Sequence, residues 1–218
     1  MRPTSSIGSC AVAAVACCAL AAGPASAALP EFIPGAGVHF VAKSGKTILE
    51  TVSKNKLTCH ADNGEGEIVA PKTLTVKLVL TGCQNKKVPC NTVGRGAGEV
   101  VLSADGTLGY VVNPEVKEVG LDLATPTGAP LMEFVCGPAL RGFVSGSVIG
   151  KITPVNTFVK PPKHFTLLFK QAGGHEAITH LFGEPVDVPF TSFGGPSEES
   201  GLASKDMLGF AAPVDIAA

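Results

Sequence analysis

The apolar residues of the stretch 74–80 recur at every second position, and this alternation constrains the fold more than any other feature. Leu74, Val76, Leu78 and Leu80 fall on one face of an extended chain, with Thr75 and Lys77 among the residues of the other face. A period of two residues is typical of a β-strand with one buried side. Residues 66–70 precede this stretch across a Pro-Lys pair, so we expect the two to form a β-hairpin.

Further short stretches of strand character follow along the chain, separated by turn signals. We expect strands over residues 98–103, 107–112, 117–123, 131–136, 140–149, 163–171 and 177–182, with tight turns at Ala104-Asp105-Gly106 and Gly173-Gly174. No stretch after residue 27 has a convincing helical period, and residues 200–208 allow at most a turn or two of helix. The predicted fold is therefore all-β, an antiparallel β-sandwich or barrel.

The first 27 residues have the pattern of a signal peptide. Arg2 is followed by an apolar, Ala-rich run over residues 7–22, and Ala25-Ser26-Ala27 places small residues before the bond to Ala28. The run is short for a membrane anchor, which needs roughly 20 residues. A lipoprotein would carry its lipid on Cys17, but the residues before Cys17 do not fit that pattern. We expect cleavage between Ala27 and Ala28.

The remaining chain, residues 28–218, is predicted to be one secreted β-rich domain, because about 190 residues can bury a core of their own. No composition shift or repeat divides it. The stretch 191–201 contains two tandem glycines, Pro196 and three serines, and we expect residues 191–218 to form a loop-rich tail.

Four cysteines remain after cleavage, an even number that predicts two disulfides in an exported chain. They are Cys59, Cys83, Cys90 and Cys136. Their spacing contains no Cys-x-x-Cys pair, which argues against a zinc site. We favour Cys83–Cys90 with Cys59–Cys136, because residues 84–89 read as a polar loop that a local bridge would close. Cys59–Cys83 with Cys90–Cys136 is the main alternative.

Composition argues against several classes of partner. Removal of residues 1–27 takes away Arg2, so the mature chain has 16 Lys and Arg and 18 Asp and Glu. A nucleic-acid-binding domain, in contrast, usually has a basic surface. The chain has no Trp and one Tyr, the residues on which sugar-binding surfaces depend. We expect no nucleic-acid partner and no membrane span in the mature chain. The partner itself stays open, with the cell envelope as one place of association.

The histidines do not form a recognisable catalytic or metal-binding motif. His175 and His180 are five residues apart, whereas a zinc-protease helix needs a spacing of four, and in a strand they would face opposite sides. Ser145 lies one position late for a nucleophile elbow in the stretch 142–146. We therefore interpret His175 and His180 as exposed turn and strand residues.

The acidic residues Asp62, Glu65 and Glu67 offer oxygen ligands for calcium, but they lack the order of an EF-hand loop. We interpret them as solvated turn residues. The glycine-rich stretch 94–98 has no helix after it that could bind phosphate. The sequence thus predicts no catalytic residue, no cofactor-binding residue and no metal ligand.

Several short segments are similar to those of a known group of proteins. They include Leu57-Thr58-Cys59, Leu80-Thr81-Gly82-Cys83, Glu133-Phe134-Val135-Cys136 and the stretch 146–156. Over roughly residues 40–210 the chain resembles uncharacterised secreted proteins of actinobacterial type. The resemblance implies export and disulfide bonds, and it implies no function.

The sequence therefore predicts an exported, non-catalytic structural or interaction protein of the cell envelope or extracellular space. The alternative is a carrier of small apolar ligands, in which the strands enclose a cavity. A secreted hydrolase is a third hypothesis. A filled core would favour the first, a large apolar cavity the second, and clustered His, Ser and carboxylate side chains in a cleft the third.

Overall fold

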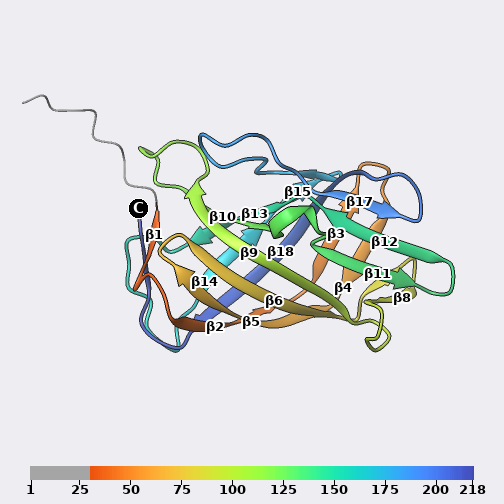
Figure 1. The fold of residues 1–218 in the computed structure, drawn as a ribbon, viewed down its shortest axis with the longest axis horizontal. Coiled ribbons are helices and arrows are strands. Elements are labelled where there is room, and N and C mark those ends of the chain that lie inside the picture. Colours follow the sequence, from red (N-terminus) through yellow and green to blue (C-terminus); the bar gives the residue numbers. More distant parts are fainter. Residues whose placement is uncertain (1–29) are drawn as a thin grey trace, which may run out of the picture.

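The computed structural model describes residues 30–218, and nearly all of its regular structure is antiparallel β-strand (Figure 1). The strands are β1 Glu31–Ile33, β2 Val38–Ser44, β3 Thr47–Thr51, β4 Lys56–Cys59, β5 Ala61–Ala70, β6 Thr73–Thr81, β7 Gln84–Asn85, β8 Val88–Asn91, β9 Val100–Tyr110, β10 Val119–Ala124, β11 Met132–Cys136, β12 Leu140–Ser145, β13 Val148–Thr153, β14 Phe165–Phe169, β15 Gln171–Ala172, β16 His175–Glu176, β17 Phe190–Phe193, β18 Glu198–Phe210 and β19 Asp215–Ala217. One 3-10 turn, η1, covers Pro126–Gly128. The predicted signal peptide and the Ala27–Ala28 bond lie outside the described residues.

Fifteen strands form one large sheet, which closes on itself twice through β18. Residues 204–210 of β18 pair with β14 on one side and β2 on the other, which closes a ring in the order β14-β13-β10-β9-β6-β5-β2-β18. We call this the main ring. Residues 198–203 of β18 pair with β3 and β17, which closes a second ring in the order β18-β3-β4-β7-β8-β11-β12-β17, the small ring. The predicted fold class is confirmed, and the strands close as in a barrel.

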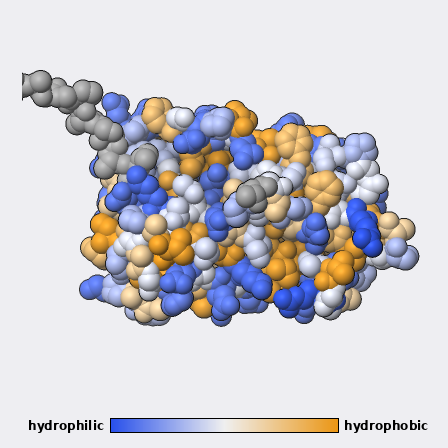
Figure 2. Space-filling view, in the orientation of Figure 1, coloured by the Kyte–Doolittle hydropathy of each residue, from blue (hydrophilic) through white to orange (hydrophobic). Residues whose placement is uncertain are grey.

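The main ring owes its shape to the alternation seen in the sequence. In β6 every second residue is buried, and the same holds for β2, where Val38, Phe40 and Ala42 face inward. The inner apolar side chains of both rings belong to one continuous core. On the face shown in Figure 2, hydrophobic and hydrophilic residues are interspersed, so this core is covered there by a mixed surface.

Glycines on β5 let the core side chains approach the backbone closely. A Cβ added to Gly66 would lie 2.3 Å from Cζ of Phe40 and 2.2 Å from the carbonyl oxygen of Thr75. A Cβ added to Gly64 would lie 2.4 Å from a methyl group of Leu78. These strand glycines therefore leave space that larger side chains from neighbouring strands fill.

Two disulfides are present, as predicted, but the favoured pairing is wrong and the main alternative is the one observed. The bonds are Cys59–Cys83 and Cys90–Cys136. The register places Cys136 directly opposite Cys90, on the neighbouring strands β11 and β8. Residues 84–89 are not a loose loop that needs a local bridge, because β7 and β8 form a hydrogen-bonded hairpin of their own. Each arm of that hairpin is instead bonded to a different strand.

The C-terminal region is the largest departure from the predicted architecture. Residues 191–218 are not a loop-rich tail, since they contain most of β17 together with β18 and β19, and β18 is the longest strand, with 13 residues. Residues 200–208 lie within that strand and are not helical. Serine and aspartate occupy some of the inward positions of β18, and this hides its alternation in the sequence.

Three further strand predictions are corrected. Residues 104–106 do not turn, because Asp105 pairs with Thr75 and Ala124 in the middle of the continuous strand β9. The stretch 140–149 is divided between β12 and β13 at Gly146, whose φ is 84°. Residues 177–182 form no strand, although Leu181 is buried and packs over Gly109. The predicted hairpin of residues 66–80 is confirmed as part of β5 and β6.

Candidate functional site

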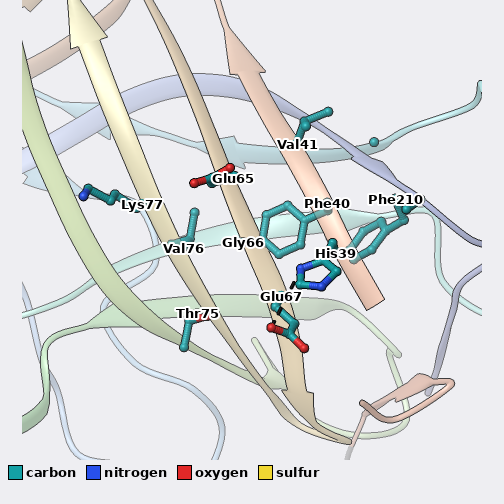
Figure 3. A pocket seen from close by; sticks show the side chains of 12 residues that line it. His39, Phe40, Val41, Glu65, Gly66, Glu67, Thr75, Val76, Lys77 and Phe210 are labelled. Carbon is teal, nitrogen blue, oxygen red and sulfur yellow. Dashed lines mark ion pairs between the residues drawn. The ribbon is translucent and has the colours of Figure 1, made fainter. Parts of the chain in front are cut away.

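A large hollow lies on the outer face of the main ring. It is a groove of about 600 Å³ that spans β2, β5, β6 and the end of β18 (Figure 3). Its lining consists of His39, Phe40, Val41, Glu65, Gly66, Glu67, Thr75, Val76, Lys77, Gly209, Phe210 and Ala211. We call it the outer groove. Since its residues come from both ends of the chain, only the ring closure through β18 brings them together.

Small residues and buried aromatic rings form the floor of the outer groove. Gly66, Gly209 and Ala211 contribute no bulk above the sheet. The rings of Phe40 and Phe210 lie beneath them, with centroids 5.0 Å apart. Both rings are almost fully buried, so the floor is rigid and apolar.

Charged side chains form the walls. His39 lies opposite Glu67 in the register of β2 and β5, and its Nδ1 lies 3.8 Å from Oε2 of that glutamate. Glu65 lies opposite Lys77 on β6. Figure 3 shows the His39 and Glu67 side chains next to each other, with Val41 on the far side of Phe40. The walls thus combine both signs of charge with one exposed apolar side chain, Val41, which is 53% exposed.

The interior of the main ring, in contrast, is filled with side chains. The cavities that we find there have volumes of about 10 and about 20 Å³. A site for a small organic ligand usually has several hundred Å³, whereas 10 to 20 Å³ is of the order needed for one water molecule. An eight-stranded ring is about the size that its own side chains can fill.

A network of polar side chains lies beside the larger of these cavities, where the two rings meet. Asp62 and Asp206 are 3% and 4% exposed. Ser204 donates a hydrogen bond to Asp206 (2.7 Å) and lies 3.2 Å from the hydroxyl of Thr47, while Ser44 donates to Asp62. Burial raises the pKa of Asp206 to about 7, with a further contribution from the charge of Asp62, and burial also raises the pKa of Asp62.

Two more carboxyls, Glu176 and Asp122, have raised pKa values at other positions. Glu176 accepts a hydrogen bond from the backbone N–H of Leu202 (2.7 Å), and burial raises the pKa of this glutamate to about 8. Burial is also the main cause that raises the pKa of Asp122 to about 6, with smaller contributions from the charges of Asp187 and Glu184. Neither carboxyl lines the outer groove.

The structure separates the residues that the sequence singled out. His175 lies on β16 and its Nδ1 is 2.7 Å from Oε1 of Glu199, whereas His180 lies in a loop next to Thr179. Asp62 faces the interior of β5, while Glu65 and Glu67 face outward, so these three carboxylates do not converge. They belong to a strand, which corrects the interpretation as turn residues. Within residues 30–218, no group of three His, Cys, Asp or Glu side chains is arranged to hold a metal ion.

Most residues of the outer groove were not identified from the sequence. Thr75 and Lys77 were recognised only as the outward face of a strand. His39 was interpreted only as one of several surface histidines without a motif, and Val41 was not considered. The signal that could have located them is the alternation of Val38, Phe40 and Ala42, which places His39 and Val41 on the outside. The pairing of β2 with β5 depends on contacts far apart in sequence, which local patterns do not reveal.

Comparisons with protein-family models, with curated proteins and with solved structures found no match for this chain. Within residues 30–218, the structure contains no helix that is long and apolar enough to cross a membrane. Two disulfides are typical of proteins that work outside the reducing cytosol.

Proposed function

We propose that the protein is an exported, non-catalytic structural or interaction module of the cell envelope or extracellular space, and that the outer groove is where it contacts its partner. The observation that carries the proposal is a contrast within the main ring. Its interior holds cavities of only about 10 and 20 Å³, while its outer face has a groove of about 600 Å³. Recognition on the outer surface therefore fits the molecule better than carriage of a ligand inside it.

The lining of the groove supports contact with a macromolecule. Side chains of both charges surround a rigid apolar floor, as in protein interfaces with an apolar centre and a polar rim. The groove is open to solvent, whereas small-molecule sites bury most of their ligand. Export is supported by the two disulfides, by the signal-peptide pattern of residues 1–27 and by the resemblance to secreted proteins.

The test is binding of the purified mature protein to washed envelope fragments of the producing cells. Thr75→Trp places a large ring in the groove, since Thr75 is exposed and lines it. Val101→Trp is the matched control, because Val101 faces outward from β9 beyond the groove. We expect Thr75→Trp to weaken binding by about tenfold, equivalent to about 1.4 kcal/mol, and Val101→Trp to leave it unchanged. Equal binding by both variants, or no binding by the unaltered protein, would contradict the proposal.

A further inference from the structure

Four lysines surround a second hollow, on the small ring. The hollow has a volume of about 310 Å³ and is lined by Lys54, Lys56, Thr58, Gln84, Lys86 and Lys87. We call it the lysine basin. The chain has 14 lysines and a formal net charge of −1, so nearly a third of its lysines gather at one place on a slightly acidic protein. The basin lies on a different ring from the outer groove.

Two of these lysines occupy a turn that ordinarily favours other residues. Lys86 and Lys87 connect β7 to β8 as a two-residue hairpin turn, and their φ angles are 48° and 70°. Left-handed φ at both central residues is the geometry for which Asn-Gly is preferred. Lysine side chains are therefore present where the backbone alone would favour Asn, Asp or Gly. Strained positions of this kind are concentrated at functional sites.

The hairpin that carries these lysines is fixed on both arms. Cys83 precedes β7 and is bonded to Cys59, while Cys90 on β8 is bonded to Cys136. Between them, the side-chain amide of Asn85 donates a hydrogen bond to the backbone oxygen of Lys56 (2.8 Å). The lysines of the turn are thus held against β4, which carries Lys56. A fixed site loses less entropy when it binds a ligand.

One carboxylate borders the basin and leaves an excess of positive charge. Oε2 of Glu50 lies 3.1 Å from Nζ of Lys56, and its Oε1 lies 3.6 Å from Nζ of Lys54. Within residues 30–218, neither Lys86 nor Lys87 forms an ion pair with a carboxylate. Glu50 therefore orients two of the ammonium groups, while the two on the turn stay available to a ligand.

We propose that the lysine basin binds an anion with closely spaced phosphate groups. Lysine binds phosphate as a point charge, and several ammonium groups around one hollow suit a ligand with several negative charges. The lining contains no arginine, the side chain best suited to paired hydrogen bonds with a planar carboxylate. A volume of about 310 Å³ is at the lower end of the range for small-ligand sites. A soluble oligophosphate and a lipid headgroup share this chemistry.

The experiment uses calorimetric titration of the purified mature protein with sodium tripolyphosphate at low salt. The decisive variant combines Lys86→Asn with Lys87→Gly, which removes two charges and supplies the residues that the turn prefers. We expect about tenfold weaker binding without any loss of thermal stability, so a folding defect cannot account for the result. The matched control combines Lys160→Asn with Lys163→Asn, two exposed lysines outside the basin, and should bind as the unaltered protein does.

A second arm measures sedimentation with vesicles of phosphatidylcholine that contain cardiolipin, whose headgroup joins two phosphates through one glycerol. Binding in either arm that is lost in the basin variant and weakened by added salt supports the proposal, and the arm in which it occurs identifies a soluble or a lipid-borne source. Equal binding by the basin variant and the control, or no binding by the unaltered protein in either arm, would overturn it. Thr75→Trp should leave both arms unchanged, which separates this result from the test of the outer groove.

Discussion

Asp62 and Asp206 are inward-facing carboxyls in a ring whose inner side chains are mostly apolar. They were not predicted as a pair, because Asp62 was grouped with Glu65 and Glu67, and Asp206 lay in the supposed tail. Their proximity arises only when β2 and β18 pair, which places Asp206 opposite Ser44 and Ser44 opposite Asp62. The sequence could have indicated two polar inward positions, but their contact depends on strand pairing.

Folding therefore favours the protonated form of Asp206, and stability should fall as the pH rises. The pKa of this carboxyl is about 7 in the folded protein, against an ordinary value of 3.8. The stabilisation is complete below about pH 4 and is lost as the pH rises through about 7, by as much as about 4 kcal/mol. The raised pKa of Glu176 acts in the same direction, up to about pH 8.

The measurement is the free energy of unfolding in urea at pH 5 and at pH 8. We expect the unaltered protein to be more stable at pH 5, and Asp206→Asn to reduce the difference, because the amide does not ionise. Asp105→Asn is the control, since Asp105 is an exposed carboxyl on β9. Stability that rises with pH, or a difference that Asp206→Asn leaves intact, would contradict this interpretation.

At the scale of elements, the predicted strands were right where local patterning is strong and wrong where packing overrides it. The hairpin of β5 and β6 follows from clean alternation and a Pro-Lys turn. In β9, an Asp-Gly pair that usually marks a turn stays extended, because β6 and β10 pair with it on both sides. In β18, inward Ser204 and Asp206 interrupt the apolar face, and four strands nevertheless pair with it.

Adjacent residues of β18 should differ sharply in their effect on stability. Leu208 faces the core and is 2% exposed, whereas Met207 faces outward and is 47% exposed. We expect Leu208→Ala to reduce the free energy of unfolding by about 2–5 kcal/mol through loss of buried area and creation of a cavity. Met207→Ala should change it by about 0.5 kcal/mol or less. Thermal or urea unfolding of both variants checks this prediction. Equal losses of unfolding free energy in the two variants would contradict the inward position of Leu208 and the outward position of Met207.

At the scale of the whole molecule, the sequence predicted the fold class and the presence of two disulfides, because alternation and an even cysteine count are local or compositional signals. It did not predict the two closed rings or the cysteine pairing. Both depend on which distant strands become neighbours, as when β8 pairs with β11 and aligns Cys90 with Cys136. The outer groove was missed for the same reason.

The two disulfides also contribute to the stability of the whole domain. They span sequence separations of 24 and 46 residues. Loops of that length correspond to roughly 3.5 and 4 kcal/mol of stabilisation in the chain-entropy model. The bonds have a second consequence at this scale, since they hold the lysine hairpin between β4 and β11.

Export is the premise that the disulfides, the envelope role and the contact through the outer groove all share. The most direct test is the intact mass of the protein recovered from the envelope or medium, before and after alkylation of free thiols without reductant. We predict a chain that begins at Ala28, takes up no alkylating groups and yields the linked peptides of Cys59–Cys83 and Cys90–Cys136. A chain that retains residues 1–27, a lipid mass on Cys17, or free thiols at these four cysteines would contradict the account.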